Sequence, residues 1–191
     1  MPPSELVEIH RRLLSAYRAA HGPLPCWKHL DPVSQLIHTM LGKRTRDPVA
    51  RRAFKVLCHR FMFWTELADL PPAMLQKLIE PVTFADQKAI ELGQALQGVT
   101  ARHGALELDF LDSWPVEPAR SWLERLSGVG PKTSAAVVNF STLKKPALVA
   151  DTHYLRFSER FGLIAKGAST TVAHRTLAAL VPPDMTADDL E

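Results

Sequence analysis

The sequence has few cysteines and no long apolar run. Its 191 residues include two cysteines, Cys26 and Cys58, which form no CxxC pair, so neither a disulfide framework nor a zinc site is predicted. No stretch approaches the roughly 18 apolar residues that a membrane span needs. The N-terminus lacks the basic and apolar blocks of a secretory signal. We therefore expect a protein of a reducing compartment, cytoplasmic rather than secreted and without a membrane partner.

Strand patterns are also scarce, and the only segment that could form a strand is the short one at 147–149. Apolar residues recur at helical spacing along most of the chain, which predicts an all-α fold. A final helix is predicted over 169–180. Earlier helix starts are predicted at polar residues that can act as N-caps: Ser4, Asp31, Asp47, Asp86 and Asp151.

Net charge is small, at +3, but the charges are unevenly placed. Residues 43–60 contain seven Lys and Arg against one acid, and residues 132–166 contain six against two. These two basic segments could be the two banks of one anionic cleft. Solvated helix faces are the simpler alternative, and composition alone slightly favours them.

The most specific stretch is the string from Leu123 to Ala135, LERLSGVGPKTSA. A helix ends, Gly128 and Gly130 turn the chain, and Pro131 opens a second helix. Free N–H groups at that new helix start make an anion site, so the string predicts a helix–hairpin–helix that binds a DNA phosphate. A Walker phosphate loop is rejected because Pro131 separates the glycine from the lysine and a helix precedes it. A purely structural turn explains the glycines but not the whole string.

Two residues near this hairpin could carry chemistry. Lys132 lies in the first turn of the second helix, where the dipole disfavours an ammonium and favours a nucleophilic amine able to form a Schiff base. A surface phosphate contact is the alternative, which the lysine taken alone favours. Asp151 is expected to be an N-cap, and its carboxylate could also move protons and stabilise positive charge at a sugar carbon.

These motifs together resemble the endonuclease III family of helix–hairpin–helix DNA glycosylases. The hairpin string 126–135 is followed at family-like spacing by Ala-Asp-Thr-His at 150–153. Segments 40–47 and 82–89 resemble the loops that precede the family's third helix and its long helix. The resemblance runs from about residue 5 to the chain end.

The resemblance implies roles for named positions. Lys132 matches the lysine that attacks C1′ of the damaged nucleotide, and Asp151 matches the essential aspartate. The other implied DNA-binding residues are Arg44, Thr45, Phe84, Ser127, Gly128, Val129, Gly130, Thr133 and His153. Main-chain carbonyls of Glu124, Leu126 and Val129 match an alkali-ion site of the superfamily.

Three positions depart from the family pattern. Arg44 replaces a common glutamine, which changes what can pair with the orphan base, and Thr83 replaces a common glycine. Phe84 could equally be a wedge into the opposite strand or a core residue. The family's four cysteines for a [4Fe–4S] cluster are absent from residues 1–191, so the chain is either a shortened member without a cluster or a fragment.

The resemblance therefore implies two helical lobes flanking a DNA cleft. A six-helix barrel over 25–130 ends in the helix–hairpin–helix, and a second, discontinuous helical lobe joins 1–24 to 131–191. The implied activity is that of a base-excision-repair glycosylase with abasic-site lyase activity on oxidised pyrimidines. Its expected partner is double-stranded DNA with damaged bases or abasic sites, and we expect a monomer located with the DNA. A monofunctional glycosylase and a non-catalytic DNA-binding module are the alternatives.

Overall fold

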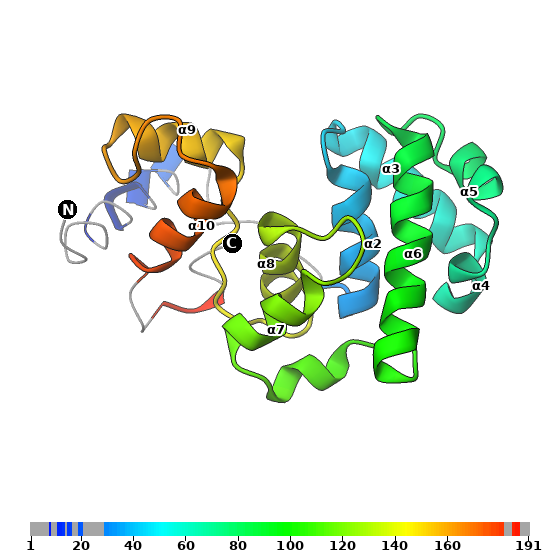
Figure 1. Cartoon of the computed structure of the whole chain (residues 1–191). Helices are drawn as coiled ribbons and strands as arrows, with labels where there is room; N and C mark the ends of the chain where they lie inside the picture. Colours follow the sequence, from blue (N-terminus) through cyan, green and yellow to red (C-terminus); the bar gives the residue numbers. More distant parts are fainter. Residues whose placement is uncertain are drawn as a thin grey trace.

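The protein is all-α, and the described helices form two groups (Figure 1). The computed structural model describes residues 8, 11–13, 15–16, 19–20, 29–181 and 185–187. Within them lie α2 (Pro32–Gly42), α3 (Asp47–Arg60), α4 (Trp64–Ala68), α5 (Pro72–Leu78), α6 (Ala85–His103), the 3-10 helix η1 (Asp109–Ser113), α7 (Val116–Leu123), α8 (Pro131–Phe140), α9 (Thr152–Arg160) and α10 (Thr170–Ala178).

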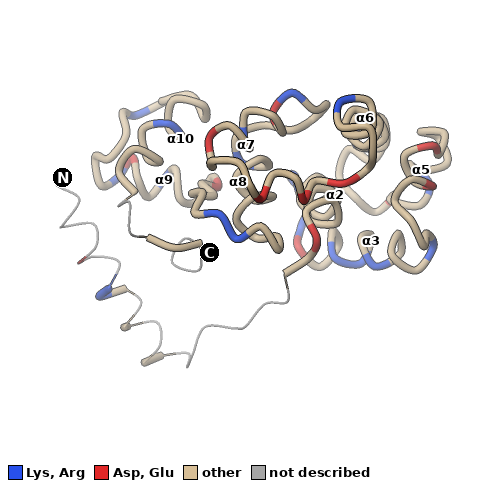
Figure 2. The backbone as a smooth tube through the Cα atoms, turned by 90° about the horizontal axis from the view of Figure 1, so that it is seen from below, with Lys and Arg blue, Asp and Glu red and all other residues tan. Residues whose placement is uncertain are grey.

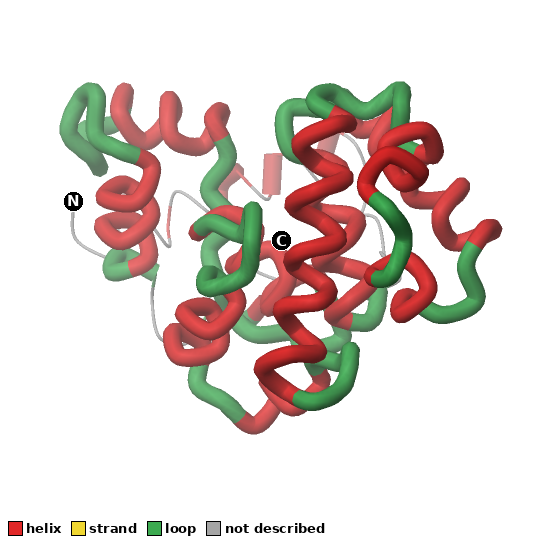
Figure 3. The backbone as a smooth tube through the Cα atoms, turned by 45° about the vertical axis from the view of Figure 1, so that its right-hand side comes forward, coloured by secondary structure: helices red, strands yellow, loops and turns green. Residues whose placement is uncertain are grey.

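Short loops join these helices, and no strand is drawn in the part that is described (Figure 3). The weak strand pattern at 147–149 is therefore not realised. Pairing in the described residues is limited to an isolated parallel bridge between Leu30 and Ser141. None of the described helices is long and apolar enough to cross a membrane.

Two of the predicted aspartate caps are confirmed. Asp31 precedes α2, and its Oδ1 accepts a hydrogen bond from the amide of Ser34 at 2.9 Å. Asp151 precedes α9, and its Oδ1 accepts from the amides of His153 and Tyr154 at 2.9 and 2.7 Å. Both carboxylates satisfy donors that the helix itself leaves unpaired.

Two other predicted caps are wrong, and Ser4 lies outside the described residues. Helix α3 begins at Asp47 itself, after Arg46, and α6 begins at Ala85, after Phe84. Phe84 has left-handed backbone angles, with φ of 58°, so the chain turns into the helix before Asp86 is reached. Asp47 and Asp86 instead lie in first turns, where the helix dipole favours a carboxylate.

A large core, defined here as the main cluster of buried apolar side chains, draws on α2 to α8. Helix α2 lies at its centre and packs on α3, α6 and α8, with Leu36, Ile37 and Leu41 fully buried. Burial of several side chains of this size, at about 2 kcal/mol each, is what holds these helices together.

A small core lies beneath α9 and α10. Its buried members among the described residues are Leu148, Ala150, Ile164, Ala173 and Leu177. Helix α10 packs on α8, which joins the two helix groups. Helix α8 also gives residues to the large core. The domain boundary expected between residues 130 and 131 remains a prediction.

Candidate active site and nucleic-acid interface

The predicted hairpin lies between α7 and α8, beside α6 (Figure 1). Its turn is closed by the amide of Leu126, which donates to the carbonyl of Leu123 at 3.0 Å, and by that of Val129, which donates to the carbonyl of Leu126 at 3.2 Å. Gly130 then precedes α8, with Pro131 in the first helical position. The geometry at the start of α8 is thus the one that the sequence predicted, and anion binding by the amides of this first turn stays a prediction.

Gly128 is required in this turn for two reasons. Its φ of 70° lies in the left-handed region that side chains disfavour. A Cβ atom at this position would also lie 2.5 Å from Oε2 of Glu91 on α6. The hairpin therefore approaches α6 closely enough that only a glycine fits without movement.

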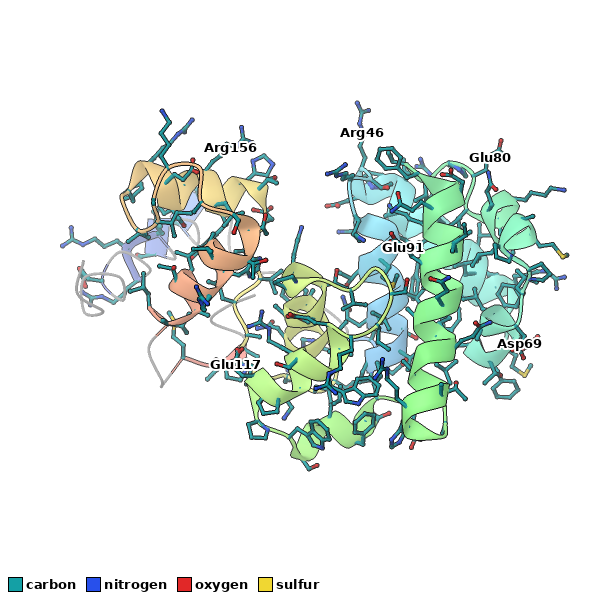
Figure 4. All side chains as sticks on the ribbon, in the orientation of Figure 1. Arg46, Asp69, Glu80, Glu91, Glu117 and Arg156 are labelled. Carbon is teal, nitrogen blue, oxygen red and sulfur yellow. The ribbon has the colours of Figure 1, made fainter. Side chains whose placement is uncertain are left out.

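Polar contacts fasten the hairpin to α6 and to the loop after α2. Ser127 donates from Oγ to Oε1 of Gln94 at 2.9 Å. Lys43 donates from Nζ to the carbonyl of Gly128 at 3.0 Å and lies 3.3 Å from Oε2 of Glu91. Figure 4 shows Glu91 on the side of α6 toward the hairpin. The hairpin and the loop at 43–46 are thus physically joined.

A buried arginine supports the hairpin from the other side. Arg120 on α7 is 7% exposed and lies 2.8 Å from Glu117 and 3.6 Å from Glu124. Ser134 on α8 donates from Oγ to Oε1 of Glu124 at 2.6 Å and also lies 3.4 Å from Nε of Arg120. This network fixes the first turn of α8, which carries Lys132.

The structure places Lys132 and Thr133 differently within that turn. Lys132 is the second residue of α8, and its side chain is exposed. Thr133 is 4% exposed, so any contact it made with a ligand would come from its main-chain N–H. The amine is therefore accessible from solvent beside the hairpin, while its neighbour is a packing residue.

Asp151 lies half-buried at the start of α9. Its Oδ1 holds the two amides of the helix start, so the N-cap role is confirmed. The second oxygen, Oδ2, is left for other chemistry, and both predicted roles are compatible with this geometry. His153 is exposed, with Nδ1 at 3.4 Å from Nη2 of Arg156.

A buried histidine contacts the residue before Asp151. His174 on α10 is 3% exposed, and its Nε2 donates to the carbonyl of Ala150 at 3.0 Å. Burial lowers the pKa of His174, and the positive charges of Arg120 and Lys132 lower it further. That Lys132 and Asp151 face each other stays a prediction.

Arg44 and Phe84 share an unusual backbone conformation. Both lie in the left-handed region, with φ of 52° and 58°, and Lys144 is the third such non-glycine residue described. Each costs roughly 1–2 kcal/mol, and strain of this kind concentrates at functional sites. Both side chains are exposed, Phe84 by 52%, which decides between its two interpretations against a core role.

Thr45 points into the protein rather than toward solvent. Its Oγ1 accepts from Nζ of Lys88 at 2.9 Å, and the residue is half-buried. The side chain therefore shapes the loop at 43–46, and Arg44 is the exposed group that the loop presents.

One arginine from each helix group points to the same side of the molecule. Figure 4 shows Arg46 after α2 and Arg156 on α9 pointing the same way, and Figure 2 shows Lys and Arg spaced along α3. Lys145 of the second basic segment instead donates from Nζ to the carbonyl of Asp112 at 2.6 Å. That segment does not act as one continuous bank.

The comparisons with known proteins identify the class. Residues 37–183 match the model of the HhH-GPD superfamily base excision DNA repair proteins. The chain therefore belongs to this superfamily of base-excision-repair DNA glycosylases, as the resemblance implied. It is 32% identical to Endonuclease III of Thermotoga maritima over 178 residues, which cover 93% of this chain and 76% of that protein.

Solved structures show the same fold. A trapped endonuclease III–DNA covalent intermediate has a TM-score of 0.78 at 21% identity, over 99% of this chain and 83% of that one. A thermostable thymine-DNA glycosylase has a TM-score of 0.72 at 20% identity, over 97% and 83% of the two chains. The all-α fold that the resemblance implied is confirmed.

The residues of this chain do not fit the iron–sulfur cluster of the family. A [4Fe–4S] cluster takes four cysteine thiolates, and the sequence has two cysteines. Cys58 is exposed on α3, and Cys26 lies outside the described residues. No group of three or more His, Cys, Asp or Glu in the described part could hold a metal ion.

Sequence reasoning missed three residues that shape the site: Lys88, Glu91 and His174. Each acts through a partner far away in the sequence, such as Gly128 for Glu91 and Ala150 for His174. A weak signal existed for the first two. Lys88, Glu91 and the hairpin partner Gln94 are spaced three apart on α6, which puts three polar residues along one side of the helix.

Proposed function

We propose that this protein is a DNA glycosylase with abasic-site lyase activity that acts on oxidised pyrimidines in duplex DNA. Lys132 supplies the nucleophile, Asp151 assists it, and the hairpin at 127–130 holds the DNA phosphate. The observation that carries the proposal is an exposed amine in the first turn of α8, directly after the hairpin, in a chain whose Asp151 lies half-buried at the start of α9.

The chemistry follows from these groups. The damaged nucleotide is turned out of the stack, and the neutral amine of Lys132 forms a bond to C1′ while the bond to the base breaks and the base leaves with its electron pair. Asp151 stabilises the positive charge that develops at the sugar and moves the proton from the amine. The C1′–O4′ bond of the sugar then breaks, O4′ leaves with its electron pair and takes up a proton, and the lysine nitrogen forms the C=N bond of the Schiff base. This protonated Schiff base acidifies C2′, and loss of a C2′ proton expels the 3′ phosphate by β-elimination.

Other residues bind and position the DNA in this proposal. Arg44 and Phe84 occupy the gap left by the base and the opposite strand, and their exposed, strained positions support that role. Arg46 and Arg156, which point to the same side, are suited to phosphates on either side of the lesion. The carbonyls of Glu124, Leu126 and Val129 would hold an alkali ion. That ion takes no part in the steps above.

Borohydride trapping on a duplex with one abasic site tests the proposal. We expect the wild-type protein to form a covalent adduct and Lys132→Ala to form none, because the Schiff base requires the amine. Lys77→Ala is the matched control, since it removes an exposed lysine from α5 and should trap as the wild type does. Folded wild-type protein without an adduct would favour a binding module. Base release without strand cleavage would favour a monofunctional glycosylase.

Asp151 is tested by Asp151→Asn in the same assay. The amide oxygen still caps α9, so the fold is kept, while loss of the carboxylate should slow base release by about 100-fold or more. Asp31→Asn alters the equivalent cap of α2 and should leave base release unchanged. Equal effects of the two variants would assign Asp151 a capping role alone.

A further inference from the structure

A buried lysine holds the loop that presents Arg44. Lys88 lies in the first turn of α6 and is 5% exposed. Its Nζ donates to the carbonyl of Leu41 at 2.7 Å, to Oγ1 of Thr45 at 2.9 Å and to the carbonyl of Lys43. Three acceptors satisfy the three donors of an ammonium. One acceptor is in the last turn of α2 and two are in the loop at 43–46.

The same residue is fixed to the turn that presents Phe84. The amide of Lys88 donates to the carbonyl of Phe84 at 2.9 Å, which closes the first turn of α6. The main chain of Lys88 thus bonds to Phe84, and its side chain bonds to Lys43 and Thr45, the residues on either side of Arg44. Lys88 thus ties the loop that presents Arg44 to the turn that presents Phe84.

A second contact extends the unit to the hairpin. Lys43, next to Arg44, donates to the carbonyl of Gly128 and lies beside Glu91, which also accepts from Nε2 of Gln87 at 2.6 Å. The loop, the turn before α6 and the hairpin thus form one bonded assembly. Burial, and then the charge of Lys43, lowers the pKa of Lys88 to about 8, which leaves it mainly charged at neutral pH.

We infer that Lys88 is a positioning residue that sets Arg44 and Phe84 at the spacing needed to read the base opposite the lesion. The inference rests on the proposed function, because it assumes that these two side chains enter the DNA. Lys88 itself is buried and touches no DNA in this view. Without its donors, three inward acceptors lose their partner, and the strained conformation of Arg44 is no longer enforced.

The test measures trapping rates for the wild type and Lys88→Met on five abasic substrates. Four are duplexes with A, C, G or T opposite the site, and the fifth is the single strand. For Lys88→Met we expect trapping on the best duplex to fall about tenfold and the differences among the four opposite bases to flatten. Trapping on the single strand, which has no opposite base, should change less than about twofold.

Controls separate this role from a general loss of stability. Lys77→Met removes an exposed lysine from α5 and should keep the wild-type dependence on the opposite base. If circular dichroism shows that Lys88→Met does not fold, Lys88→Gln, which keeps an N–H donor, takes its place. The same loss of trapping on the best duplex and the same flattening among opposite bases are expected. An unchanged dependence on the opposite base, or an equal loss on duplex and single strand, would overturn the inference. A wild-type protein that traps no substrate would instead overturn the proposed function. That result differs from an unchanged dependence on the opposite base and from an equal loss on duplex and single strand, because both of those require trapping by the wild type.

Discussion

The two helix groups differ in how much apolar material holds them together. The large core is built from seven helices, α2 to α8, while the small core among the described residues consists of five buried side chains, two of them alanines. The proposed chemistry is divided between them. Lys132 and the hairpin adjoin the large core, and Asp151 begins a helix over the small one. The parts proposed to contact DNA thus adjoin the core with more buried side chains, and the proposed carboxylate adjoins the core with fewer.

Substitution of a central leucine in each core gives the largest expected effect. Leu36→Ala on α2 removes a fully buried side chain at the centre of the large core and should lower the free energy of unfolding by about 4 kcal/mol. Leu177→Ala on α10 removes a side chain that is 2% exposed from the small core, where the cost should be about 2–3 kcal/mol. Urea unfolding followed by far-UV circular dichroism measures both.

The control for this pair is Met62→Ala. Met62 is 85% exposed, and its loss should change stability by less than about 0.5 kcal/mol. Equal costs for the two leucines would mean that the small core is as densely packed as the large one. The contrast between the two groups would then fail.

Local signals in the sequence were sufficient for most of the fold. Apolar residues at helical spacing and the caps at Asp31 and Asp151 depend on a few neighbouring residues. The expected cap at Asp86 failed for a reason that pattern alone does not reveal. Phe84 takes a left-handed conformation that aromatic residues rarely adopt.

The candidate site was predictable where it is contiguous. The hairpin and Lys132 lie within a few residues of one another, so their string could be interpreted directly. The contacts that fasten the hairpin and the loop at 43–46 to α6 and to each other join residues 33 to 85 positions apart, as between Ser127 and Gln94 or Lys43 and Gly128. No local pattern encodes such pairs. They appear only when α2, α6 and the hairpin are packed together.

Gly128→Ala tests whether the hairpin is packed closely against α6, in the helix group with the large core. The substitution places a Cβ atom at a φ of 70° and 2.5 Å from Glu91, so we expect a loss of about 1–3 kcal/mol and weaker trapping on an abasic duplex. Gly130→Ala is the matched control. Gly130 has extended angles, and a Cβ there meets no atom within 4 Å, so the cost should stay below about 1 kcal/mol.

The steric part of this effect can be separated from the conformational part. Adding Glu91→Ala to Gly128→Ala removes the carboxylate that the new Cβ would meet, and stability should be partly recovered. No recovery would assign the whole cost to the backbone. Equal costs at Gly128 and Gly130 would show that the hairpin is not held closely against α6.

The smallest expected effect concerns pH, and it compares one histidine from each group. Burial lowers the pKa of His174 beside the small core and also that of half-buried His38 on α2. A lowered pKa in the folded state means that the unfolded chain takes up a proton first. Stability should therefore fall as pH drops below about 6.5, the ordinary histidine value, and should continue to fall until the folded pKa is passed.

His174→Gln should reduce this acid sensitivity more than His38→Gln, because His174 is more deeply buried and faces the charges of Arg120 and Lys132. Glutamine can still donate to the carbonyl of Ala150, so the variant removes the titration and keeps the contact. Urea midpoints at pH 7 and pH 5 give the comparison. Lys132→Met should act in the same direction by a smaller amount, since it removes one of the charges that oppose protonation of His174. An acid response that is unchanged in both His174→Gln and Lys132→Met would contradict this prediction. It would mean that protonation of His174 does not contribute to the loss of stability in acid.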